Sequence, residues 1–183
     1  MKKYLFGIIL LSSIVLTSGC INNGNQTINN TQNNTQTYNG DQFTFNYPAN
    51  WQQISGQAMN STAAVGDPAT ADSNGNVQVN VVIQKAVKPS NETLQEYYNS
   101  TYAQFAAQKN LSYRQLSDGT IVVNGKTGLE NVYQINSVTQ EQKRAVWIQN
   151  GSNIYIILCS APVSQYDSQQ ANFNAIINSF KLI

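Results

Sequence analysis

The chain has 183 residues, enough for one domain with a hydrophobic core plus a leader and a linker. It contains no histidine, which excludes Ser/His/Asp and Cys/His nucleophile schemes and nearly every catalytic zinc site. Charge is sparse, with 10 Lys and Arg against 9 Asp and Glu, so we expect no nucleic-acid partner.

The N-terminus has the pattern of an export signal. Met1 is followed by Lys2 and Lys3 and then by the apolar run "YLFGIILLSSIVL". A membrane-spanning helix needs about 20 predominantly apolar residues, and this run of 13 is shorter. Residues 1–19 are therefore predicted to be a lipoprotein-type signal peptide.

Cys20 is the predicted site of lipid attachment. Lipoprotein signal peptides resemble this stretch, with small residues such as Ser18 and Gly19 before a Cys that becomes the first mature residue. The sequence departs from that pattern at Thr17, where Leu is most common; Leu16 lies one position earlier. The alternatives are an uncleaved anchor or secretion with a free Cys. The prediction places the protein on the extracytoplasmic face of the cell membrane, lipid-anchored.

Residues 20–40 are rich in Asn, Gln and Thr and lack apolar periodicity, so we expect a disordered tether. It contains three N-glycosylation sequons, at Asn25, Asn29 and Asn33, spaced four residues apart. We treat these as predicted acceptor sites in an exported chain. Further sequons follow at Asn60, Asn91, Asn99, Asn110 and Asn150.

Alternating apolar residues begin just after Asp41. Phe43, Phe45 and Tyr47 alternate with polar residues up to a turn at Pro48, which predicts a half-buried strand. The segment "NVQVNVVIQKA", residues 76–86, repeats this alternation after a "DSNGN" turn.

The next segment, residues 89–110, has the pattern of a helix of four to five turns. Ser90 is the expected N-cap, Glu92 and Glu96 lie near the N-terminus, and apolar residues including Leu94 and Phe105 recur at helical spacing.

The rest of the domain has mainly the pattern of strands. "SDG", "VNGK" and "QNGS" are the predicted turns between them. A last helix is expected after a capping box at Ser164–Asp167, with one apolar stripe on it. The predicted strands are 111–117, 120–123, 127–136, 143–149 and 153–160, and the stripe is Phe173, Ile176, Ile177 and Phe180.

This order of elements predicts an α+β domain over residues 41–183. Two helices that each bury one face need a sheet to pack on, and short hairpin connections favour an antiparallel sheet. We therefore expect an antiparallel β-sheet flanked by helices, in an α/β sandwich.

The domain resembles the PsbP-like family. The motifs are "F.F.YPANW", a mid-chain helix, a "G..G.E..Y" stretch at Gly125, Gly128, Glu130 and Tyr133, a hairpin at Asn150, and a final "F...I.SFK" helix. The resemblance spans residues 41–181 and implies an antiparallel sheet between helices and a non-enzymatic role. Its best-known member is an extrinsic protein of photosystem II, and lipoprotein relatives occur in prokaryotes. His-based metal binding in the family does not transfer to a chain without His.

Three groups of residues are candidates for a chemical site. The first is Asp67, Asp72, Asn74 and Asn76, which offer oxygen ligands for calcium but lack the acidic residue that closes an EF-hand loop, so a polar turn is favoured. The second is Glu130, a buried acid or, as favoured here, a strand residue that is exposed or paired with Lys126 or Arg144.

The third group is a set of aromatic residues, which form either a glycan-binding platform or, as favoured here, the core. They are Trp51, Tyr97, Tyr98, Tyr102, Trp147 and Tyr155. Cys159 lies in an apolar run and is predicted to be a buried, inert thiol.

These observations lead to a function hypothesis with two alternatives. The first choice is a membrane-anchored, non-enzymatic lipoprotein that binds or scaffolds an unidentified protein partner, without cofactor or metal. One alternative is a small-ligand or cell-wall-glycan binding module. The other is a hydrolase with an acid pair, for which Asp67 and Glu130 would have to lie within about 10 Å of each other.

Overall fold

The computed structural model describes residues 35–55, 60–136 and 140–183. The predicted signal peptide, residues 1–19, lies outside the described residues, as do Cys20 and the sequons at Asn25, Asn29 and Asn33.

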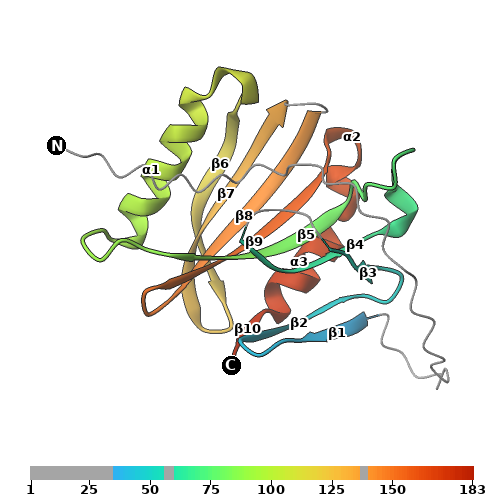
Figure 1. The fold of residues 1–183 in the computed structure, drawn as a ribbon, viewed down its shortest axis with the longest axis horizontal. Helices are drawn as coiled ribbons and strands as arrows, with labels where there is room; N and C mark the ends of the chain where they lie inside the picture. The colour runs from blue at the N-terminus through green and yellow to red at the C-terminus, as the bar shows by residue number, and fades with distance from the viewer. Residues whose placement is uncertain (1–34, 56–59, 137–139) are drawn as a thin grey trace.

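Two antiparallel sheets make up most of the fold (Figure 1). One has three strands in the order β1-β2-β10, and the other has seven in the order β3-β4-β5-β9-β8-β7-β6. The strands are β1 (Thr35–Asn39), β2 (Phe43–Pro48), β3 (Gln52–Gln53), β4 (Ser61–Gly66), β5 (Asn80–Val87), β6 (Arg114–Val123), β7 (Lys126–Asn136), β8 (Gln140–Asn150), β9 (Asn153–Pro162) and β10 (Lys181–Leu182). The helical segments are η1 (Pro68–Thr70), α1 (Leu94–Ala107), η2 (Lys109–Leu111), α2 (Val163–Tyr166), η3 (Asp167–Gln169) and α3 (Gln170–Ser179).

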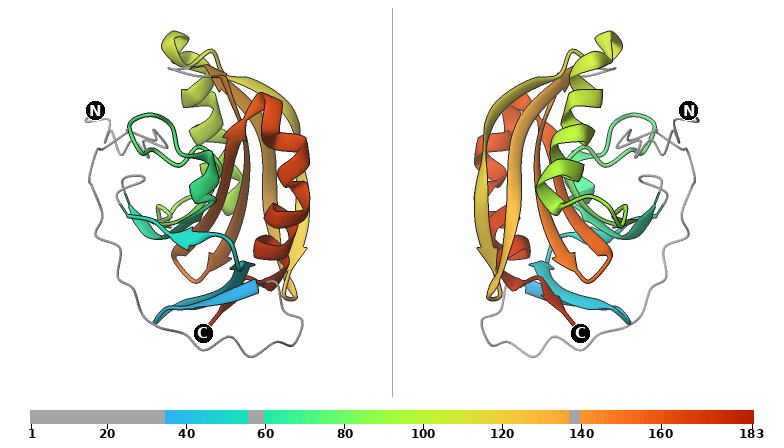
Figure 2. Two further views of the ribbon diagram at one scale, coloured as in Figure 1. Left: turned by 90° about the vertical axis from the view of Figure 1, so that its right-hand side faces the viewer. Right: turned by 90° about the vertical axis from the view of Figure 1, so that its left-hand side faces the viewer.

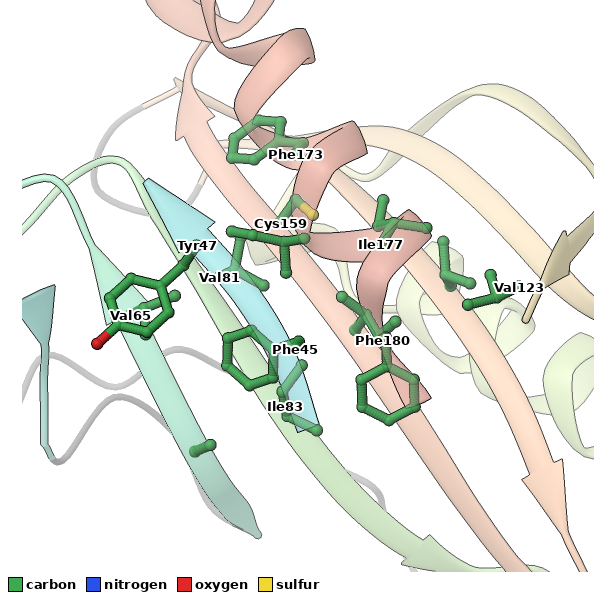
Figure 3. Packing of buried hydrophobic residues seen from close by; sticks show 14 of the residues in the cluster. Phe45, Tyr47, Val65, Val81, Ile83, Val123, Cys159, Phe173, Ile177 and Phe180 are labelled. Carbon is green, nitrogen blue, oxygen red and sulfur yellow. The ribbon is translucent and has the colours of Figure 1, made fainter. Parts of the chain in front are cut away.

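The seven-stranded sheet separates two hydrophobic cores, one under α1 and one under α3 (Figure 2). Successive residues of a strand point to opposite faces, so in β8 Trp147 belongs to the α1 core while Val146 and Ile148 belong to the α3 core. Figure 3 shows the α3 core, in which Phe45 of β2 and Phe180 meet side chains of the large sheet. The predicted α+β sandwich is confirmed.

The two Asn-Gly hairpins form where the sequence predicts them. Asn124 and Gly125 both have positive φ, 46° and 78°, as a tight two-residue turn between β6 and β7 requires. Gly151, between β8 and β9, also has a positive φ of 62°. The predicted turn at "SDG" is wrong. Asp118 and Gly119 pair with Asn131 and Glu130 of β7, so β6 continues through this stretch.

The domain begins earlier than predicted. Strand β1 lies inside the segment assigned to the tether, residues 20–40, and pairs with β2 from Thr35 opposite Pro48 onward. Its sequence, TQTYN, is mostly polar and lacks the apolar alternation that predicts a strand. Its stabilisation comes instead from backbone pairing with β2 and from Tyr38. The ring of Tyr38 stacks on Phe45 with 5.0 Å between centroids.

Both predicted helix caps differ from the structure. Thr93, not Ser90, caps α1, in a capping box where the Thr93 amide donates to Glu96 Oε2 at 2.7 Å. The expected box at Ser164–Asp167 is absent, because the helical segment begins at Val163, directly after β9, with Pro162 in the cap position. Phe173, one residue of the predicted stripe, is fully buried.

No helix within the described residues is long and apolar enough to cross a lipid bilayer.

Candidate binding face

On its outer strands, the α3 side of the large sheet is only partly covered. On the outer strands β6, β7 and β8, several side chains that point to this side are half-buried, whereas the residues directly under α3 are buried. We call this surface the open face and define it by Ile121, Glu130, Val132, Gln142 and Arg144. It combines two apolar side chains with polar groups on a rigid sheet, a composition that suits binding of a partner.

An ion pair lies at the centre of the open face. Arg144 Nε lies 2.7 Å from Glu130 Oε1, and Arg144 Nη1 donates to Asn174 Oδ1 of α3 at 2.6 Å. The side chains of Arg144 and Glu130 are 14% and 25% exposed, so they are accessible to a partner. The prediction that Glu130 pairs with a neighbouring cation is confirmed, and the cation is Arg144.

A ladder of side-chain amides extends the face toward the sheet edge. Arg114 Nη2 donates to Gln134 Oε1 at 2.7 Å, and Gln134 Nε2 donates to Gln142 Oε1 at 3.0 Å. The ladder crosses β6, β7 and β8, and it fixes the orientation of polar groups that could bind a peptide backbone.

A hollow of about 260 Å³ lies at the other end of α3, beside the β6–β7 turn. Its apolar lining includes Ile148 and Phe180, and Lys126 and Lys181 add two ammonium groups. Within the described residues neither lysine has an ion-pair partner. Asn124 holds the turn against the helix end, because its Nδ2 donates to the Phe180 carbonyl at 2.6 Å. The hollow therefore suits an acidic group.

The α1 side, by contrast, is closed by aromatic rings. Five of the six aromatic residues considered for a glycan platform are buried, and Tyr97 is half-buried, so the core interpretation is confirmed. Trp147 Nε1 donates to the Tyr102 hydroxyl at 3.1 Å, inside a cluster where the ring of Tyr98 also packs on Trp147. Burial raises the pKa of Tyr102 well above its ordinary value.

A buried polar cluster on the α1 side was not found from the sequence. Lys143, 1% exposed, lies 3.0 Å from Glu141 Oε2 and donates to Ser160 Oγ at 3.1 Å. A Ser–Lys pair at this distance occurs in some hydrolases. Here Ser160 is only 3% exposed, so a substrate does not reach it. The alternation of side chains along β8 could have predicted the burial of Lys143, since Lys143 shares a face with the buried Ala145.

The candidate calcium loop is a set of polar turns. Asp72 Oδ1 accepts from the Asn74 and Asn76 amides, both at 2.9 Å, and the Asn76 side chain donates to Oδ2. These hydrogen bonds, the one from the Asn76 side chain first, lower the pKa of Asp72. Asp67 accepts separately from the Ala69 amide. Within the described residues no three acid or thiol side chains are grouped as metal ligands.

The acid pair required for a glycosidase does not form. Asp67 follows β4 and Glu130 lies in β7, and β5, β9 and β8 separate these strands. At about 4.8 Å between neighbouring strands, β4 and β7 lie roughly 19 Å apart across the sheet, well beyond the separation that an acid pair requires.

Cys159 is fully buried in β9, as predicted. Burial raises the pKa of its thiol to about 12, so it is protonated and unreactive at neutral pH. The sequon asparagines inside the domain are all exposed; they are Asn60, Asn91, Asn99, Asn110 and Asn150.

The family described as PsbP-like protein matches residues 7–182. The chain belongs to the PsbP-like protein family. The match confirms the resemblance seen in the motifs, and it also includes Cys20 and most of the predicted leader. No sequence among the curated proteins matches the chain.

Solved structures share this PsbP-like fold at low sequence identity. Cyanobacterial PsbP (CyanoP) from Synechocystis sp. PCC 6803 superposes with a TM-score of 0.60 at 14% identity, over 86% of this chain and 98% of that one. LpqN of Mycobacterium tuberculosis, which is involved in cell envelope biogenesis, gives 0.57 at 8% identity over 82% and 92%. A mutant form of the protein Mog1 gives 0.55 at 11% identity over 82% and 96%. These similarities establish the fold alone.

Proposed function

We propose that this PsbP-like protein is a lipid-anchored extracytoplasmic lipoprotein whose domain binds or scaffolds a protein partner without catalysing a reaction. The observation that carries the proposal is the open face. It places an accessible ion pair between Glu130 and Arg144 beside half-buried apolar residues, on a sheet held rigid by two cores. The fold it shares with CyanoP, LpqN and Mog1 is compatible with a binding domain.

The chemistry of the described residues favours binding over catalysis. The Ser160–Lys143 pair is buried, Cys159 is protonated at neutral pH, and the two acids considered for hydrolysis lie several strands apart. The polar groups of the open face, by contrast, are pre-oriented by hydrogen bonds, which lowers the entropic cost of ordering them when a partner binds.

Charge indicates the chemistry of the partner. Lys126 and Lys181 border the hollow beside the β6–β7 turn. Arg114 adds a positive charge where the open face continues toward the sheet edge. A partner segment that presents Asp or Glu to the hollow and apolar side chains to Ile121 and Val132 would complement this surface.

The proposed anchor rests on the leader pattern and Cys20. Because β1 begins at Thr35, 14 residues separate Cys20 from the domain. A flexible chain of that length has a root-mean-square span of about 20 Å, enough to hold a small domain clear of a bilayer surface.

Detergent-phase partitioning of the full chain tests the anchor. We expect the wild type in the detergent phase and Cys20→Ser in the aqueous phase. Equal partitioning of the two would refute lipid attachment at Cys20. Cys20→Ser leaves the open face intact, so the test examines the membrane attachment of the protein separately from its binding role.

A further inference from the structure

Strand β6 forms one edge of the large sheet, and β7 is its only strand neighbour within the described residues. Every residue from Arg114 to Thr120 is exposed. In both views of Figure 2 the β6–β7 pair lies at the margin of the sheet, away from β3 and β4. An exposed edge strand presents unpaired N–H and C=O groups and can pair with another strand.

Apolar side chains on this edge are placed symmetrically in the sequence. Leu116 and Val122 are 40% and 65% exposed, and they are two of the four exposed large hydrophobic residues in the described part of the chain. Each lies three positions from Gly119, and Leu116 lies at a β-bulge, where the register with β7 shifts between Gln115 and Ser117. By residue count, a two-fold axis at Gly119 puts Leu116 of each copy opposite Val122 of the other.

The phase of the backbone hydrogen bonds agrees with this axis. Val123 and Lys126 close a two-residue turn, so Val123, Ile121 and Gly119 bond to β7. Asp118 and Thr120 then direct their N–H and C=O groups outward. Pairing about Gly119 puts Asp118 of one copy opposite Thr120 of the other, as a hydrogen-bonded pair without like charges facing each other.

Gly119 itself suits the position on the axis. It would face Gly119 of the second copy in the closer, non-hydrogen-bonded type of pair, where Cα atoms are about 4.5 Å apart. A Cβ added at Gly119 meets nothing within 4 Å in one copy, so this part of the edge is unobstructed. We propose that two copies of the chain pair antiparallel through β6 about Gly119, joining their large sheets into one.

Disulfide trapping tests the register directly in the full chain. The axis distance lies inside the Cα separation of about 4.4–6.8 Å that a disulfide spans, so we expect Gly119→Cys to give a covalent dimer under mild oxidation. Asn99→Cys, exposed on α1, is the matched control and should stay monomeric. Both variants retain Cys20, and the buried Cys159 does not compete.

A charge pair at the apolar positions separates specific pairing from chance collision. In the Gly119→Cys background, Leu116→Lys with Val122→Lys places like charges opposite each other twice, and we expect about tenfold less dimer. Leu116→Lys with Val122→Glu places opposite charges there and should retain the dimer. Both positions are exposed, so thermal unfolding should be unchanged in both variants. Dimer from Gly119→Cys no greater than from Asn99→Cys, or equal in the two charge variants, would overturn the proposal.

Discussion

The two sides of the large sheet differ in how far they are closed. On the α1 side, interlocking aromatic rings surround Trp147, and even the charged Lys143 is hidden from solvent. On the α3 side, the core is equally tight under the helix, but the outer strands keep Glu130 and Arg144 accessible. Both cores supply stability, whereas the outer strands on the α3 side keep polar groups accessible to solvent. Substitutions in either core should therefore lower stability, and substitutions on the open face should change it little.

The largest expected effect is on the closed side. Trp147→Ala removes a fully buried ring and its hydrogen bond to Tyr102, and we expect the free energy of unfolding to fall by about 3–5 kcal/mol. Urea unfolding measures it. The control is Val122→Ala, at a side chain 65% exposed, which should change stability by about 0.5 kcal/mol or less. Similar losses of unfolding free energy in the two variants would contradict the assignment of Trp147 to the core.

The buried ion pair should respond unequally to loss of its two partners. Glu141→Ala leaves the charge of Lys143 buried and unpaired, and we expect a loss of about 3–5 kcal/mol in unfolding free energy. Lys143→Met leaves Glu141, which is 17% exposed, near water and removes one hydrogen bond to Ser160, so we expect about 1 kcal/mol. Chemical denaturation compares the two, and the reverse order would show that Lys143 reaches solvent.

Gly128 lies in β7 at a point where the backbone of the neighbouring strand β8 approaches closely. An added Cβ would lie 2.5 Å from the Trp147 carbonyl oxygen and 2.6 Å from Ile148 Cδ1. Gly128→Ala should therefore cost about 1–3 kcal/mol through overpacking. Gly119→Ala, at a position with open space, is the matched control and should cost less. Thermal unfolding that ranks them the other way would refute this close approach.

The smallest effect is expected on the open face. Glu130→Gln removes the charge from a part-exposed ion pair, and such pairs contribute about 0–1 kcal/mol to stability. Any loss should shrink further at high salt, because screening weakens accessible charges. Unfolding measured at low and high ionic strength checks this. A loss as large as that of Glu141→Ala would mean that the pair belongs to the core.

The sequence predicted the parts of the fold that local chemistry determines. The turn at Asn124–Gly125 needs two positive φ angles, and the stripe on α3 needs helical spacing, so both could be read from the chain. Strand β1 could not, because its stability comes from pairing with β2 and from the stacking of Tyr38.

The candidate site divides in the same way. Pairing of Glu130 was predictable from nearby cations, but the choice of Arg144 depends on the register between β7 and β8. The hollow beside Lys126 and Lys181 joins residues 55 positions apart, and only the tertiary fold brings them together.

Site-specific photo-crosslinking in native membranes tests the binding role of the open face most directly. A photoreactive residue at Ser117, which pairs with Val132 of the open face, is compared with the same residue at Asn99 on α1; both positions are exposed. We expect Ser117 to give a discrete adduct with another protein, distinct in mass from a dimer of this chain, and Asn99 to give none. Adducts from Asn99 alone, or no adduct from Ser117, would contradict binding through the α3 side.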